Sequence, residues 1–171
     1  MPSLSLILQH IPTWVWAVLA FILVMGVRQS RAQRMSRPRL LILPLAWLAF
    51  GAWGVESTFG LNAAPLLAWA LGLGASLWAM KRSGWPGDAR FDAGSGHFLV
   101  PGSWLPMALM LAIFAAKFAL GFSLALRPAL AQHPLFAAAF SLGFGALSGI
   151  FLGRSRNILG RAPAALRTAE A

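Results

Sequence analysis

Lys117 is the residue best placed to do chemistry, because it lies inside a long apolar run. If that run crosses a membrane, a charge near its middle costs about 2.5–3.5 kcal/mol on insertion scales, so the residue is expected to have a partner or a function. Glu56 lies at the end of another apolar run, and we predict that Glu56 and Lys117 form an ion pair. Two alternatives stay open: Lys117 extends its charge outward to water, or it binds an anion or relays a proton in transport.

A second pattern is a stripe of small residues near the C-terminus. Its members recur at intervals of four: Ala137, Ser141, Gly145, Gly149 and Gly153. On a helix this spacing places all five on one face, where they let another backbone approach closely in lipid. We expect an internal helix as the partner, with the alanine-rich segment 104–126 as the first candidate. A second copy of the chain is the alternative.

The residues that enzymes use are few, with three histidines and four acidic residues in the chain. The sequence contains no zinc-protease, nucleophile-elbow, phosphate-loop or dinucleotide-binding motif. Asp88, Asp92 and His97 lie close together in sequence, but their spacing matches no established metal site. We therefore predict no catalytic, cofactor or metal site, and we expect the protein not to be an enzyme.

The composition indicates what kind of element carries these residues. Hydrophobic residues make up 58% of the 171 residues, before the 17 glycines are counted, and charged residues make up 11%. Globular domains average about 45–50% apolar residues with glycine included and about 25% charged residues. Too few polar residues remain to cover a water-soluble domain, and disorder would need low hydrophobicity. The composition therefore predicts a multi-pass membrane protein.

Five apolar runs are long enough to be helices that cross a bilayer core of about 30 Å. The predicted spans are 12–27, 40–55, 63–80, 104–126 and 134–152. We therefore predict an all-α membrane protein, a bundle of five transmembrane helices in residues 1–153, followed by a basic cytoplasmic tail, 154–171. Between the third and fourth spans, two short strand-like runs flank the turn-forming residues 93–96, which predicts a small cytoplasmic hairpin.

The positive charge is distributed unevenly between the two sides of these spans. The chain has 14 basic residues and a net charge of +10. Twelve of the basic residues follow spans one, three and five, whereas only Arg127 falls on the other side. This asymmetry predicts an N-terminus outside and a C-terminus in the cytoplasm, with a bacterial inner membrane as the simplest location. It also argues against nucleic acid as a partner, which would require a basic face on a soluble surface.

Five arginines follow the first span: Arg28, Arg31, Arg34, Arg37 and Arg39. The three-residue spacing of the first four is similar to that of a voltage-sensor helix, but the residues between them are mostly polar and do not suit hydrocarbon. We interpret them as anchors to anionic lipid headgroups on the cytoplasmic side, at about 1 kcal/mol for each basic residue near the surface.

Three segments together carry a resemblance to a known group of proteins. They are Arg90-Phe91-Asp92, the run Val100-Pro101-Gly102-Ser103-Trp104-Leu105-Pro106 and the helix that bears Lys117. The chain resembles a family of small multi-pass bacterial inner-membrane proteins of unknown function, over most of its length. The resemblance implies a membrane protein and adds no activity.

Two functional hypotheses follow. The first is a non-enzymatic membrane protein that acts through helix packing with itself or with other membrane components, homo-oligomers included. The alternative is a small solute or ion carrier or channel that uses Lys117 and Glu56.

Overall fold

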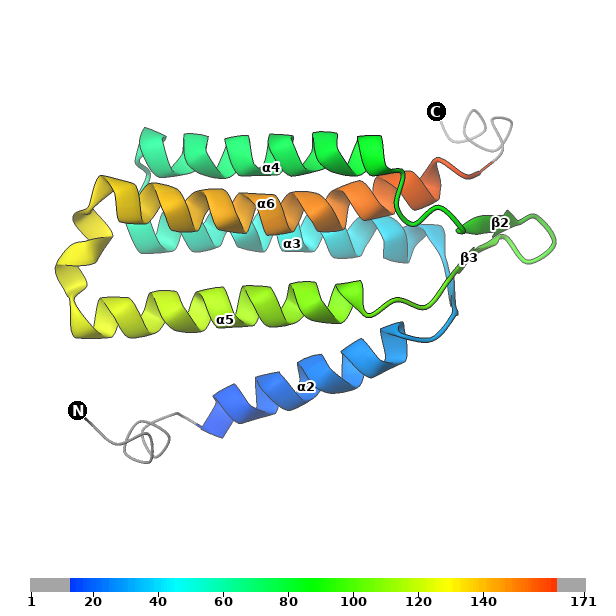
Figure 1. The fold of residues 1–171 in the computed structure, drawn as a ribbon, viewed down its shortest axis with the longest axis horizontal. Coiled ribbons are helices and arrows are strands. Elements are labelled where there is room, and N and C mark those ends of the chain that lie inside the picture. Colours follow the sequence, from blue (N-terminus) through cyan, green and yellow to red (C-terminus); the bar gives the residue numbers. More distant parts are fainter. Residues whose placement is uncertain (1–12, 163–171) are drawn as a thin grey trace.

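The computed structural model describes residues 13–162, which are mostly helical (Figure 1). In chain order the elements are α2 (Thr13–Gln29), β1 (Gln33–Met35), α3 (Arg37–Phe59), α4 (Ala63–Ser83), β2 (Arg90–Asp92), β3 (His97–Val100), α5 (Leu105–Leu126), the 3₁₀-helix η1 (Pro128–Gln132) and α6 (Pro134–Leu159). The structure therefore has five α-helices and one small sheet in its described part.

Four of the helices, α3 to α6, are long and apolar enough to cross a membrane. Helix α2 has 17 described residues, at the lower end of the working range of about 17–25 residues. The prediction of a multi-pass membrane protein is therefore confirmed to the extent that four helices have the length and composition of membrane spans. The predicted start of the first span, Pro12, and the tail residue Arg167 lie outside the described residues.

The last helix extends further than predicted. The predicted fifth span ends at residue 152, but α6 continues to Leu159, so the first residues of the predicted tail are helical. Gly153, one residue past the predicted end, lies inside the helix and packs closely, because a Cβ there would lie 2.6 Å from Met80 Cβ. By contrast, α4 does end at Gly84, where the backbone is left-handed with a φ of 63°, a conformation that glycine adopts most easily.

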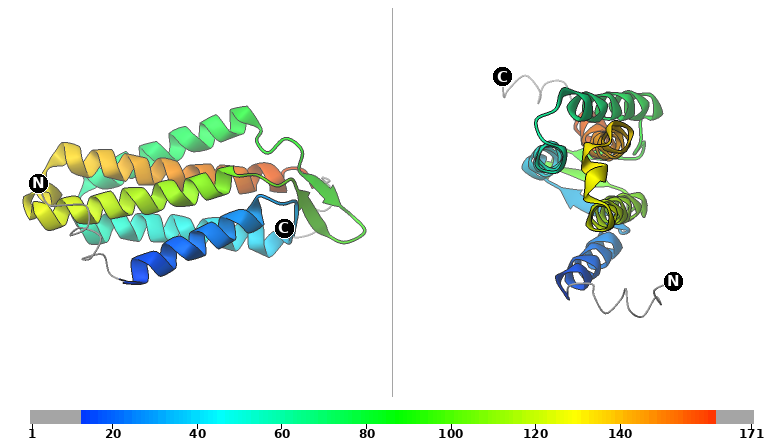
Figure 2. Two further views of the ribbon diagram at one scale, coloured as in Figure 1. Left: turned by 60° about the horizontal axis from the view of Figure 1, so that its bottom comes forward. Right: turned by 90° about the vertical axis from the view of Figure 1, so that its left-hand side faces the viewer.

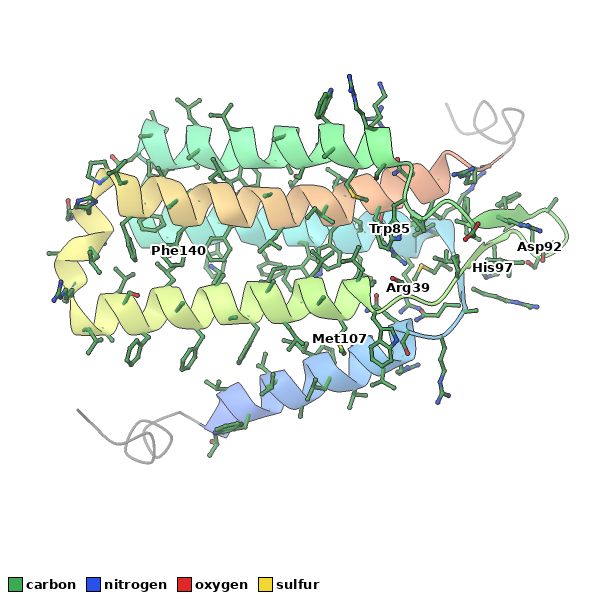
Figure 3. All side chains as sticks on the ribbon, in the orientation of Figure 1. Arg39, Trp85, Asp92, His97, Met107 and Phe140 are labelled. Carbon is green, nitrogen blue, oxygen red and sulfur yellow. The ribbon has the colours of Figure 1, made fainter. Side chains whose placement is uncertain are left out.

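The helices form two groups. Helices α3, α4 and α6 pack together, whereas α2 packs mainly against α5 (Figures 1 and 2). The α2/α5 contact is close, since a Cβ on Gly26 would lie 2.7 Å from Met107 Cβ, and Met107 is seen between the two helices in Figure 3. Near the opposite end of the molecule, Phe136, Phe140 and Phe144 follow one another along α6, with ring centroids 4.8 and 6.2 Å apart.

The predicted hairpin is confirmed, and a third strand joins it. Strands β2 and β3 pair antiparallel, with Phe91 opposite Phe98. Strand β1, from the arginine-rich connection, pairs with the other edge of β3, giving the order β1-β3-β2. Two connections that are far apart in the sequence therefore lie at the same end of the molecule (Figure 1).

The sheet covers a small core of its own. Its inner face packs on the ends of α3 and α6 through Leu40 and Ile158, and Phe98 and Ile158 are fully buried. The remaining buried members of this cluster are Met35, Ala89, Val100 and Ala162. This cluster packs the strands of the sheet against the ends of α3 and α6.

Candidate functional site

Lys117 points from the middle of α5 toward α3 and α6. Its Nζ lies 4.6 Å from the centre of the Phe144 ring on α6. On α3 Nζ approaches Gly54, where a Cβ would lie 2.5 Å from it. Lys117 as a whole is exposed, so it lies at the edge of the interface that α5 forms with α3 and α6. The cation–π contact with Phe144 stabilises an ammonium group away from water.

The predicted ion pair between Glu56 and Lys117 is not formed. Both residues are described, and neither makes an ion pair within residues 13–162. The physical reason is rotation about α3: Glu56 follows Gly54 by two residues, which is about 200° around a helix. Since Nζ contacts Gly54, Glu56 points to the other side of α3. The alternative of a charge that extends outward to water stays a prediction, since the residue is exposed while Nζ faces α3 and α6.

Further polar groups lie one helical turn away from Lys117. A Cβ on Gly51 would lie 2.9 Å from Ser148 Oγ and 3.3 Å from Trp69 Nε1. Trp69 Nε1 and Ser141 Oγ are buried without a hydrogen-bond partner. Buried polar groups in native proteins usually have partners, so these two donors without a hydrogen-bond partner lie near an ammonium group that has an aromatic partner and no acidic one. Such a set is suited to water or to an acceptor such as a small anion.

The glycines of α3 allow these approaches without breaking the helix. Gly54 is buried within α3, which runs unbroken from Arg37 to Phe59. Its carbonyl oxygen accepts a hydrogen bond of 2.7 Å from Thr58 Oγ1, one turn further along the same helix. The glycines of α3 therefore allow close packing within a continuous helix.

The small-residue stripe is buried throughout its length. Its partner is α4 and not the predicted segment 104–126. A Cβ on Gly145 would lie 2.8 Å from the Trp69 carbonyl carbon, and one on Gly149 would lie 2.6 Å from Leu73 O. The partner is thus an internal helix. The facing side of α4 carries its own period-four series of small residues, Ala68, Gly72 and Ser76, followed by Met80.

The five predicted anchor arginines gather at the end of the molecule that carries the sheet. Arg28 ends α2, Arg34 lies on β1, and Arg37 and Arg39 lie in the first turn of α3. All but Arg37 are exposed, and the guanidinium of Arg37 lies 5.7 Å from the Phe91 ring. Figure 3 shows Arg39 at the same end as Asp92 and His97. The sequence interpretation therefore matches their exposure, whereas lipid binding itself stays a prediction.

One buried arginine at this end was not predicted. Arg154 on α6 is 8% exposed, and its guanidinium lies 5.3 Å from the Trp85 ring. The Asn157 side-chain amide donates to the carbonyls of Met80 and Trp85, at 2.8 and 2.9 Å. Figure 3 places Trp85 between the ends of α4 and α6. No local pattern reveals this junction, because its members are more than 70 residues apart in the sequence.

Asp92 and His97 have structural partners in the hairpin turn. The Ser95 hydroxyl donates to Asp92 Oδ2 at 2.6 Å and the Gly94 N–H to Oδ1 at 3.1 Å. These two hydrogen bonds, the Ser95 one first, lower the pKa of Asp92 below its ordinary value of 3.8. The His97 ring lies within hydrogen-bond distance of the Ser95 carbonyl. Within residues 13–162, no three histidine or acidic side chains gather where they could hold a metal.

Comparison with protein families gives one finding. The model of a family of unknown function, DUF6622, matches residues 2–165, and the chain belongs to that family. Neither the curated proteins nor the solved structures include a match.

Proposed function

We propose that this member of DUF6622 is a non-enzymatic protein of the bacterial inner membrane that crosses the bilayer five times. Its N-terminus lies outside and its C-terminus in the cytoplasm. Its basic end binds anionic lipid headgroups. It acts through contacts of its helices with other membrane components, which include further copies of itself.

The observation that carries this proposal is the segregation of charge along the bundle. The basic residues of the connections around the sheet and of the C-terminal end of α6 lie at one end, and Arg127 lies at the other (Figure 1). Such segregation is typical of membrane proteins with the basic end in the cytoplasm. At about 1 kcal/mol per basic residue near an anionic surface, this end is attracted strongly to the inner leaflet.

Reporter fusions test the orientation. Fusions after residues 90 and 162 are expected to report the cytoplasm, and fusions after residues 60 and 130 the outside. The opposite pattern, or a single compartment for all four, contradicts the proposal.

A nanodisc assay tests the headgroup binding. A peptide of residues 28–39 cannot replace the full-length protein in this assay, because several segments of the chain together form the basic end. Full-length protein in nanodiscs is therefore compared at rising fractions of phosphatidylglycerol, with hydrogen exchange of the sheet as the readout. Protection is expected to rise with anionic lipid and to fall with salt. Protection that is independent of both contradicts headgroup binding.

A second candidate function is an ion or solute carrier that uses Lys117. The observation that favours it is an ammonium group inside the bundle with no acidic partner among the described residues. Proteoliposomes test it, with a trapped pH dye for proton flux and an electrode for chloride flux. Flux that is lost in Lys117→Met and kept in Arg127→Gln, which removes the same charge elsewhere, supports the carrier. Flux no higher than in empty liposomes argues against it.

A further inference from the structure

The geometry points to a headgroup site for a zwitterionic aminophospholipid on the outer face of the sheet. In this site the lipid phosphate lies between the guanidinium groups of Arg34 and Arg90, and its primary amine lies at the carboxylate of Asp88. Phosphatidylethanolamine has this pair of groups. The inference rests on the proposed function, because it assigns one lipid class to the basic end.

The sheet register brings the two arginines to the same face. Leu99 of β3 pairs with Arg34 of β1 on one side and with Arg90 of β2 on the other. Directly paired residues share a face, and strands lie about 4.8 Å apart, so the two arginine backbones are roughly 10 Å apart. The neighbouring residue Phe98 is fully buried on the inner face. Arg34, Leu99 and Arg90 are all exposed on the outer face.

These residues line a shallow groove of about 330 Å³. Its charged lining consists of Arg34, Arg90 and Asp88, and its apolar lining includes Leu99, Val100 and Pro101. Small-molecule sites have volumes of about 300–1,000 Å³. The groove is therefore large enough for a headgroup and too small for a whole lipid.

The charges in the groove favour a ligand that carries both signs. None of the side chains of Arg34, Asp88 and Arg90 forms an ion pair or a hydrogen bond with another of the three. Two guanidinium groups match a phosphate, which arginine binds in bidentate geometry. A purely anionic headgroup would be repelled by the Asp88 carboxylate, whereas an ammonium group is attracted to it. The quaternary ammonium of choline has no N–H group to donate a hydrogen bond to the Asp88 carboxylate, so ethanolamine fits the groove better.

The groove lies at the depth of the headgroups. Its lining residue Ala32 follows the end of α2 at Gln29, and Pro101 precedes the start of α5 at Leu105. The two exits from the helices are tied together, because the Ser103 N–H donates to Gln29 O at 3.1 Å. A segment only three or four residues from two apolar helix ends lies at the surface of the bilayer core. This position favours a lipid over a ligand free in the cytoplasm.

Native mass spectrometry of the full-length protein in detergent tests the inference. The probes are short-chain phosphatidylethanolamine, phosphatidylglycerol and phosphatidylcholine, and inorganic phosphate. We expect the wild type to bind the ethanolamine lipid most tightly. Asp88→Asn, which keeps the side-chain shape, should lose about tenfold or more of that affinity and no affinity for the glycerol lipid. The double variant Arg34→Gln, Arg90→Gln should lose affinity for both.

The matched control removes the same charge from the same end but outside the groove, as Arg31→Gln with Arg39→Gln. It should lower the protection of the sheet in phosphatidylglycerol nanodiscs and keep the preference for ethanolamine. If the wild type shows no such preference but its sheet is still protected in phosphatidylglycerol nanodiscs, the groove inference is wrong and the proposed function stands. If it binds neither, the proposed function fails. Inorganic phosphate bound as tightly as the ethanolamine lipid would overturn a lipid as the ligand. Unchanged helical circular dichroism in each variant excludes loss of folding.

Discussion

Gly145 controls how closely α6 approaches α4, and replacing it by alanine tests this packing. A Cβ at this position would meet the backbone of α4, 2.8 Å from the Trp69 carbonyl carbon and 3.0 Å from Leu73 N. Backbone atoms cannot rotate away as a flexible side chain can, so the helices must separate. Gly143, on the same helix, has nothing within 4 Å of its Cβ position. It is therefore the matched control for the same substitution.

The size of the effect follows from the difference between the two variants. Alanine favours a helix over glycine by about 1 kcal/mol, and Gly145→Ala and Gly143→Ala share this gain. Only Gly145→Ala adds overpacking, which costs about 1–3 kcal/mol. We therefore expect Gly145→Ala to be less stable than Gly143→Ala by about 1–3 kcal/mol, with Gly143→Ala at or above the wild type.

Reversible unfolding in mixed detergent micelles measures this difference, with helical circular dichroism as the signal. The two alanine variants and the wild type are compared at one protein concentration, so that any self-association is held constant. Equal stability of the two variants within about 0.5 kcal/mol, the usual spread of a neutral surface change, would refute the close α4/α6 packing.

Two further predictions concern the sheet end of the molecule. Asn157→Ala removes both hydrogen bonds to the carbonyls of Met80 and Trp85, and it should cost about 1–3 kcal/mol in the same unfolding assay; no loss would contradict a role in joining α4 to α6. The pKa of Asp92 is lowered mainly by the Ser95 hydroxyl, so its contribution to hairpin stability is present above pH 3.8, the unfolded value, and is lost as the pH falls through the lower folded pKa. Hydrogen exchange of the hairpin amides should show this acid loss in the wild type, and Asp92→Asn should abolish it; the same acid dependence in both proteins would exclude Asp92 as its source.

The sequence predicted the elements whose signals are local. The hairpin of β2 and β3 was predictable because its strand-forming runs flank the turn residues 93–96. Strand β1 was not, since Gln33–Met35 is short and polar, and its partner Val100 lies far along the chain. Its extended conformation comes from that partner and not from its own residues.

The predicted helix partner failed for a different reason. The alanines of 104–126 suggested a second helix face of small side chains that could pack against the stripe. However, Ala112, Ala115 and Ala119 are exposed and do not pack against it. Helix α4 has the matching series of small residues, with Gly72 facing α6, where a Cβ would lie 2.9 Å from Ala146 N. The period of four does not separate the two helices either, because Ala108, Ala112 and Ala116 recur at intervals of four in α5, so only the packing identifies the partner.

The predicted pairing of Lys117 with Glu56 failed because the sequence does not give the rotation of each helix. A count along the apolar runs gives the height of a residue in the bilayer, so Lys117 and Glu56 were placed at comparable heights. It does not give the direction in which each helix turns its side chains. Gly54 and Glu56 differ by about 200° on α3, and only the packing of α5 against α3 determines that Gly54 faces Nζ.

The sheet links the two groups of helices beyond their ends. Strand β1 connects α2 to α3, and β3 leads into α5, so pairing of β1 with β3 ties the α2/α5 pair to the larger group. The inner face holds this link through Phe98, which is fully buried between the strands and the ends of α3 and α6. The outer face of the same three strands carries the groove with Arg34 and Arg90. A headgroup bound there contacts both β1 and β2, and it therefore stabilises the same pairing that joins the helix groups.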